Sequence, residues 1–189
     1  MIRIGILGDI GSGKSYIAKN FGYPVFNADK EVGKLYKKDR KIFNSLQKAL
    51  PKYVHSFPID KNEISKAILA NDINLKKIVN IVHLAIRRKM NEFIKRNINK
   101  KIVILDIPLL LENKINKKND ILIFVQSKKS DILKKLKKRK NFNKKLLSKF
   151  RNIQLALDYK KKKSSFIIKN NFKNESFKND IRYILKKFL

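Results

Sequence analysis

The feature that most constrains the fold of this chain is a glycine-rich turn near its amino end. The turn lies between a short apolar run and a stretch with helical spacing, within residues 2–19. It fits the pattern G-x-x-x-x-G-K-[ST] through Gly8, Gly13, Lys14 and Ser15. The chain has only 6 glycines in 189 residues, and four of them lie between positions 5 and 13. A strand, a glycine-rich turn and a helix in this order are the context of a phosphate-binding loop, and they argue against a chance turn.

The chemistry of this turn is specific. Successive backbone N–H groups can surround a polyphosphate only where the chain takes positive φ, which glycine does without steric cost. The helix that follows directs its unpaired N–H groups at the same anion. We expect Lys14 to reach the β- and γ-phosphates and the Ser15 hydroxyl to hold Mg²⁺. The residues expected to bind the nucleotide are Gly8, Gly11, Ser12, Gly13, Lys14, Ser15, Tyr16 and, near the adenine, Asn170.

The composition excludes several other classes of protein. Without cysteine the chain has no disulfide and no thiolate metal site, and its two histidines are too far apart in sequence to indicate a zinc cluster. The apolar start runs straight into the phosphate loop, which indicates a core strand rather than a signal peptide. The longest apolar run, residues 102–111, is interrupted by Asp106 and Pro108 and is too short to span a bilayer. We therefore expect a cytoplasmic monomer without a membrane partner.

The net charge of +32 raises the question of nucleic-acid binding. The basic residues are spread along the whole chain and most are lysine, which is more typical of solvated faces than of a binding groove. Nucleic acid is therefore not expected to be the main partner. A positive field would still attract anionic substrates such as nucleotides.

Five short strands that alternate with helices predict an α/β fold with a parallel, doubly wound sheet. After the amino-terminal strand, the strands are expected at residues 23–26, 101–106, 121–125 and 166–168. Residues 31–99 are mostly helical and exceed a simple crossover, so they predict a helical insert that grips a second substrate. We expect one domain, 1–189, with a core (1–29, 100–126 and 151–189), a helical substrate subdomain (about 30–99) and a lid (about 127–150).

Two aspartates follow predicted strands. Asp29 comes after the second strand, at the sheet edge where ligands bind in open α/β folds, so it is a candidate to accept the proton of an attacking hydroxyl. A helix N-cap for residues 30–36 explains Asp29 equally well. Asp106 ends the third strand and is expected to touch either the Mg²⁺ shell or the substrate.

Basic residues in the insert and the lid are further candidates. His83, Arg87 and Arg88 lie within two turns of one predicted helix, although a histidine at the core edge with two solvated arginines is the simpler interpretation. Arg139 is the only arginine of the expected lid. Its planar fork can pair with phosphate oxygens in a bidentate way that lysine cannot match.

Taken together, the motifs resemble those of the dephospho-coenzyme A kinase family over nearly the whole chain. The segments that carry the resemblance, in order, are IGILGDIGSGKS, PVFNAD, VHLAI, ILDIPLLLEN, ILIFV, KKLKKR, Gln154 and FIIKNN. The most specific of them are the D-A-D-type segment after the second strand and the D-I-P-L-L-x-E block. The resemblance implies a P-loop kinase that transfers a phosphoryl group from ATP to the ribose 3′-hydroxyl of dephospho-coenzyme A, the last step of coenzyme A synthesis.

The resemblance also implies roles for single residues. Asp29 matches the acid proposed as the base, Arg139 the lid arginine, and His83 the histidine of an H-P pair on the substrate side. Asp106 and Glu112 match the acids of the D-I-P block, and Lys160 falls where a basic residue often follows the glutamine. The expected catalytic residues are Asp29, Lys14 and Arg139. The residues expected to bind the acceptor substrate are Asp29, His83, Arg87, Asp106 and Glu112. Ser15 is the expected metal ligand, ATP is the expected co-substrate and Mg²⁺ the expected cofactor.

Four positions depart from the family pattern. Asp9 stands where glycine is usual, and its carboxylate would repel phosphate unless it is turned outward. Asn27 replaces the first acid of D-A-D, so that position is not expected to be required for proton transfer. Leu84 replaces the proline after the histidine, which weakens the role expected for His83. Tyr16 replaces a small hydroxyl residue, which is tolerated if Ser15 holds the metal alone.

Two other functions remain as alternatives. Another small-molecule kinase, such as a nucleoside monophosphate kinase, would need an arginine-rich site for the acceptor phosphate. Between the second and third predicted strands the chain has only Arg40, Arg87, Arg88 and Arg96, without that family's motif. A nucleic-acid-associated nucleotide-binding protein is the alternative that the net charge suggests.

Overall fold

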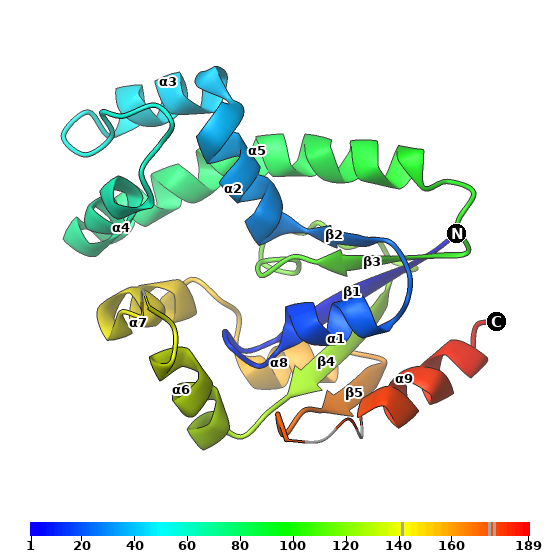
Figure 1. Ribbon diagram of the computed structural model, residues 1–189. Helices are drawn as coiled ribbons and strands as arrows, with labels where there is room; N and C mark the ends of the chain where they lie inside the picture. Colours follow the sequence, from blue (N-terminus) through cyan, green and yellow to red (C-terminus); the bar gives the residue numbers. More distant parts are fainter. Residues whose placement is uncertain (141, 174, 176) are drawn as a thin grey trace. The chain divides into compact units, whose positions relative to one another are not determined.

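The computed structural model describes residues 1–140, 142–173, 175 and 177–189, which divide into two compact units (Figure 1). The first, here called the sheet unit, comprises Met1–Asn27, Arg96–Phe142 and Gln154–Leu189. The second, here called the helical unit, comprises Ala28–Lys95 and Asn143–Ile153.

The sheet unit contains a five-stranded parallel sheet in the order β2-β3-β1-β4-β5, which confirms the predicted α/β fold class. The strands are β1 (Ile2–Gly8), β2 (Val25–Asn27), β3 (Ile102–Asp106), β4 (Ile121–Gln126) and β5 (Phe166–Lys169). The apolar strands β1 and β3 are buried along almost their whole length, as expected for the centre of a parallel sheet.

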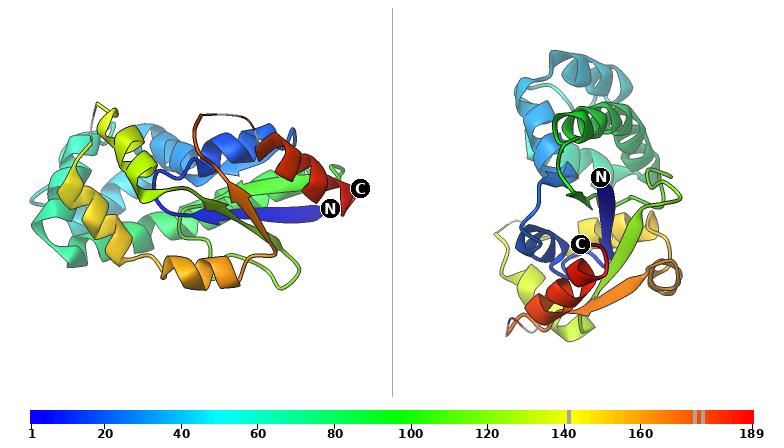
Figure 2. Two further views of the ribbon diagram at one scale, coloured as in Figure 1. Left: turned by 90° about the horizontal axis from the view of Figure 1, so that it is seen from below. Right: turned by 90° about the vertical axis from the view of Figure 1, so that its right-hand side faces the viewer.

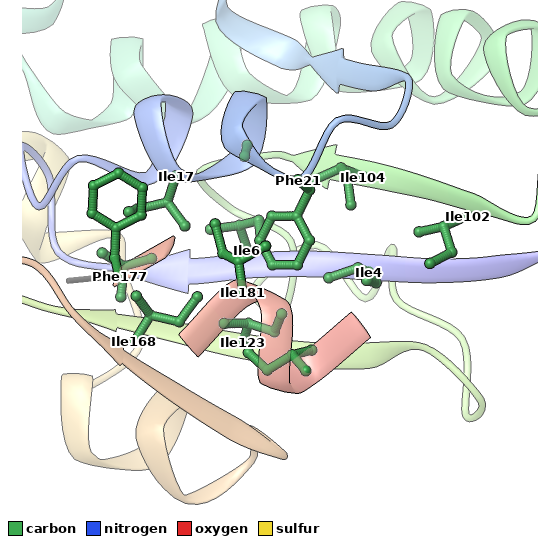
Figure 3. Close-up of a cluster of buried hydrophobic side chains, with 13 residues drawn as sticks. Ile4, Ile6, Ile17, Phe21, Ile102, Ile104, Ile123, Ile168, Phe177 and Ile181 are labelled. Carbon is green, nitrogen blue, oxygen red and sulfur yellow. The ribbon is translucent and has the colours of Figure 1, made fainter. Parts of the chain in front are cut away.

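Four helices belong entirely to the sheet unit: α1 (Lys14–Asn20), α6 (Lys129–Lys137), α8 (Leu157–Lys162) and α9 (Phe177–Lys186). Figure 2 shows α1 and α9 on one side of the sheet and α8 on the other. Between the sheet, α1 and α9 lies a cluster of buried aliphatic and aromatic side chains (Figure 3). Ile4 and Ile6 of β1, Ile17 and Phe21 from α1 and its carboxyl end, and Ile181 of α9 are among its members.

The helical unit consists of α2 (Ala28–Lys38), α3 (Arg40–Ala49), α4 (Lys61–Ala70), α7 (Lys144–Asn152) and α5 (Asp72–Arg96) up to Lys95. Three helices have side-chain caps, because Asp39, Asp60 and Asn143 accept hydrogen bonds from backbone N–H groups of the first turns of α3, α4 and α7. Helix α7 packs against α4. Lys149 of α7 also pairs with Asp72 at the start of α5, with 2.6 Å between Nζ and Oδ1.

One helix boundary differs from the sequence-based expectation. Helix α2 begins at Ala28, so Asp29 lies inside its first turn and does not cap a helix over residues 30–36. Asn143–Ile153 groups with the helical unit, and α7 packs against α4. The expected division into a core, a substrate subdomain (about 30–99) and a lid (about 127–150) remains a prediction. None of the helices in the described ranges has the length and apolar character needed to cross a bilayer.

A substitution in α9 tests the packing of this helix on the sheet. Ile181 is 3% exposed within the buried cluster, so Ile181→Ala should lower the free energy of unfolding by about 2–5 kcal/mol. Tyr183→Ala is the matched control on the same helix, because Tyr183 is 56% exposed, and it should change stability by less than about 0.5 kcal/mol. Urea unfolding followed by circular dichroism measures both. Equal midpoints for the two variants would contradict the packing described here.

Candidate active site

The position of the phosphate loop is set by β1, the central strand. On one side β1 pairs with β3, and on the other side it pairs with β4 up to the register Gly8↔Val125. The chain leaves the sheet at Gly8, at the carboxyl edge of parallel strands. Ligands of open α/β sheets bind at this edge.

Two glycines give the loop its shape. Gly11 and Gly13 have φ of 86° and 92°, in the region that residues with a Cβ rarely adopt. A Cβ on Gly13 would also lie 2.3 Å from Nδ2 of Asn170. The backbone therefore takes the positive-φ conformation predicted for an anion-binding loop.

Lys14 lies across the start of the loop. Its Nζ donates hydrogen bonds to the backbone oxygens of Gly8, at 3.1 Å, and Asp9, at 2.8 Å. The ammonium group is thus held beside the backbone that was predicted to surround a phosphate.

The unexpected acid of the loop, Asp9, is not turned outward. Its side chain is buried, at 7% exposed, and Oδ1 accepts a hydrogen bond of 2.7 Å from the backbone N–H of Ile10. The carboxylate is therefore stabilised by the loop's own backbone.

The far side of the loop is braced by the loops that follow two other strands. The backbone oxygen of Ser12 accepts hydrogen bonds from Nδ2 of Asn170, at 2.9 Å, and from Oγ of Ser127, at 3.0 Å. The Oδ1 atom of Asn170 accepts from the backbone N–H of Phe172. Sequence reasoning missed Ser127, although its place directly after β4, the neighbour of β1, was a usable signal.

A cluster of oxygen atoms lies beside the start of α1. Nδ2 of Asn27 donates to Oγ of Ser15, at 3.3 Å, and also to Oδ2 of Asp106. Ser15 is exposed, whereas Asp106 is 3% exposed. Asn27 thus links Ser15, the predicted metal ligand, to Asp106, the acid predicted to touch either the Mg²⁺ shell or the substrate.

This donor set fits Mg²⁺, which takes oxygen ligands. No group of three or more His, Cys, Asp or Glu side chains that could hold a metal occurs among the residues described. Magnesium sites often combine only one or two protein oxygens with substrate phosphates, so the oxygens of Ser15 and Asp106 are sufficient for such a site. The buried Ser12 Oγ, which has no hydrogen-bond partner within the described part of the chain, is a further polar atom in the loop.

Glu112, predicted to bind substrate, is paired inside the sheet unit. Its Oε1 lies 2.6 Å from Nζ of Lys160 and accepts a hydrogen bond of 3.0 Å from the backbone N–H of Leu155. The Lys160 side chain is 1% exposed, so the pair is buried and ties the segment after β3 to α8. A contact of Glu112 with substrate remains a prediction.

Two further predicted residues lie at the surface of the sheet unit. Tyr16 is 52% exposed, and its ring packs edge-on against Phe177 of α9 with 5.5 Å between centroids. Arg139 follows Lys138, the residue that caps the carboxyl end of α6, and is exposed. Its backbone N–H bonds to the oxygen of Leu136.

The other candidates belong to the helical unit. Asp29 is exposed in the first turn of α2. His83 and Arg87 are one turn apart on α5. Burial lowers the pKa of His83 below its usual 6.5, and the charge of Arg87 lowers the pKa further, so the imidazole is neutral at pH 7. The Nε2 atom of His83 is buried and finds no hydrogen-bond partner in the described ranges.

Comparison with known protein families gives one match across most of the chain. Residues 2–175 match the family model described as dephospho-CoA kinase. The dephospho-CoA kinase of Wolbachia pipientis wMel is 35% identical over 177 residues, which cover 91% of this chain and 90% of that protein. The dephospho-CoA kinase of Bartonella henselae is 28% identical, and the match covers 98% and 97% of the two chains.

Solved structures share the fold. The protein TT1252 from Thermus thermophilus superposes with a TM-score of 0.76 and 24% identity, covering 98% of this chain and 95% of that one. The dephospho-CoA kinase from Campylobacter jejuni gives a TM-score of 0.65 with 22% identity, covering 98% and 96%. At these identities the structural likeness is evidence of the fold alone.

A methyl group added to the loop tests its geometry. Gly13→Ala should lower the free energy of unfolding by at least about 1–2 kcal/mol, because φ is positive and the new Cβ would collide with Asn170. Gly33→Ala in α2 is the control, since nothing lies within 4 Å of its added Cβ, and it should raise stability by about 0.5–1 kcal/mol. Urea unfolding measures both variants. If Gly13→Ala were as stable as Gly33→Ala, the loop geometry would be wrong.

Proposed function

We infer the function of this chain from the family to which it belongs, the dephospho-CoA kinases. It transfers the γ-phosphoryl group of ATP to the ribose 3′-hydroxyl of dephospho-CoA and releases CoA and ADP. The observation that carries this conclusion is the family match over residues 2–175, which includes the whole phosphate loop and the strand ends around it.

The phosphate loop is proposed to hold the triphosphate. Its backbone keeps positive φ at Gly11 and Gly13, and Lys14 is anchored on the first two carbonyls of the loop. In phosphoryl transfer there is little covalent chemistry for the protein, so most of the rate enhancement comes from positioning and charge stabilisation. Ser127 and Asn170 hold the loop in place through hydrogen bonds to the Ser12 carbonyl, which supports such positioning.

Ser15 and Asp106 are proposed as the protein oxygens around Mg²⁺. The Ser15 hydroxyl is exposed at the start of α1, and the Asp106 carboxylate ends the neighbouring strand β3. A bound Mg²⁺ ion would help to neutralise the negative charge that develops during transfer.

Asp29 is proposed as the group that orients the 3′-hydroxyl and accepts its proton. Only Ala28 separates Asp29 from Asn27 along the chain, which limits the distance between their Cα atoms to about 7 Å. Asn27 in turn contacts both proposed metal-shell residues. The start of α2 at Ala28 places Asp29 in the first helical turn, where a carboxylate is favoured electrostatically.

Arg139 is proposed to pair with the transferring phosphoryl group from the end of α6. Its exposed guanidinium offers a planar set of donors for phosphate oxygens. His83, Arg87 and Glu112 remain proposed contacts of the acceptor.

The adenine ring is proposed to lie against the loop after β5. The Asn170 amide makes one hydrogen bond at each end within the protein, and neighbouring groups are proposed to add contacts with the base. The Phe172 ring is one such group. Its Cε1 atom lies 3.3 Å from the point that a Cβ would occupy if Gly13 had a side chain. Nζ of Lys135 lies 5.6 Å from the centroid of the same ring. An aromatic face beside the phosphate loop supports stacking with a base. A cytoplasmic location and a monomeric state remain predictions.

Release of ADP with different acceptors tests the proposed reaction. Purified protein with ATP and Mg²⁺ should release ADP rapidly with dephospho-CoA and slowly with AMP, with RNA or without an acceptor. Stimulation by AMP alone would favour a nucleoside monophosphate kinase. Stimulation by RNA alone would favour a nucleic-acid-associated nucleotide-binding protein.

Replacement of the proposed base tests the mechanism. Asp29→Asn should lower the turnover number with dephospho-CoA by about 10²-fold or more while ATP affinity stays near wild type, since a positioned general base contributes at least this much. Glu31→Gln is the matched control in the same helical turn. Glu31 pairs with Lys34 on the same helix, with 2.6 Å between Oε1 and Nζ. Loss of this exposed ion pair should leave the turnover number within about twofold of wild type. Steady-state kinetics and equilibrium ATP binding give both quantities. Full activity of Asp29→Asn would remove Asp29 from the mechanism.

A further inference from the structure

Asn27 is the residue at which three elements of the sheet unit meet. It is the last residue of β2, and it lies opposite Asp106, the last residue of β3, in the parallel register. Its amide nitrogen donates hydrogen bonds to Asp106 Oδ2 and to Ser15 Oγ of α1. These partners are 79 and 12 residues away in the sequence.

The chemistry of the amide suits this place. A carboxamide has two N–H donors, so it can bond the carboxylate and the hydroxyl at the same time. A carboxylate at position 27 would have no donor for Asp106 and would bring a second negative charge beside it. The buried Asp106 carboxylate, at 3% exposed, depends on such donors, because an unbonded buried charge is costly.

We propose that Asn27 is a positioning residue for the metal–nucleotide site. It fixes the separation and orientation of the Ser15 hydroxyl and the Asp106 carboxylate before Mg²⁺ and ATP bind. This inference rests on the proposed function, which assigns those two oxygens to the Mg²⁺ shell. Asn27 touches neither substrate nor a transferred proton, and it acts through the two residues that it bonds.

An amide is sufficient for this role. Proton transfer would need a titrating group, whereas positioning needs only a donor in the right place. Partners of this kind around metal ligands typically contribute about 10- to 100-fold to metal affinity. The effect of losing Asn27 should therefore appear in Mg²⁺ dependence more than in nucleotide binding alone.

The experiment measures equilibrium binding of a non-hydrolysable ATP analogue, with EDTA and across a Mg²⁺ titration. Asn27→Ala should bind the analogue in EDTA within about twofold of wild type, yet its half-saturating Mg²⁺ concentration should rise about 10-fold or more. Asn27→Ser, which keeps one donor, should give an intermediate shift. Asn20→Ala is the control, because Asn20 makes a local bond to the Tyr16 carbonyl on the same unit, and its Mg²⁺ dependence should match wild type.

The outcomes separate the possible errors. Equal Mg²⁺ dependence in Asn27→Ala and wild type overturns the proposal. An equal loss of affinity with and without Mg²⁺, together with a lower urea midpoint, also overturns it and assigns Asn27 a purely structural role. A wild-type protein that transfers no phosphoryl group to dephospho-CoA would instead refute the proposed function, independently of any Asn27 variant.

Discussion

The parallel pairing of β1 with β3 and β4 is the constraint on which the site depends. Because all three strands run in one direction, their carboxyl ends emerge at the same edge, and the residues that follow them come together whatever their distance in sequence. Gly8, Asp106 and Ser127 reach this edge from three different segments. Burial of the aliphatic side chains of the strands holds the sheet together. Hydrophobic burial therefore determines where the polar groups of the site lie.

The phosphate loop is held by hydrogen bonds that its backbone carbonyl groups accept. The Ser12 carbonyl accepts two hydrogen bonds, one from Ser127 and one from Asn170. Lys14 binds carbonyls at the other end of the loop. A loop that is already ordered loses little conformational entropy when it binds a triphosphate, so more of the interaction energy appears as affinity. The positive φ values of the glycines belong to the same preorganisation, because a residue with a Cβ would resist this conformation.

The sequence predicts the parts of this structure that depend on local pattern. The glycine-rich turn, the apolar strands and the helical insert each leave a signal within a few residues, and all of them are present. The sequence does not predict contacts made by side chains after distant segments have come together. Nothing in the neighbourhood of Asn27 indicates that its amide bonds Asp106, and nothing near Lys160 indicates that it is buried against Glu112. Helix α2 begins earlier than the helix over residues 30–36 that a cap at Asp29 would predict, because strand β2 leads directly into the helix.

Asp9 and Asn27 both affect the placing of negative charge in the site. The structure buries the Asp9 carboxylate against the backbone N–H of Ile10. Asn27 is a neutral donor that bonds the Asp106 carboxylate. Near a triphosphate, every uncompensated negative charge opposes binding, and the opposition is stronger where water is excluded. An acid bonded by backbone at Asp9 and an amide at Asn27 therefore limit the uncompensated negative charge beside Lys14 and Ser15.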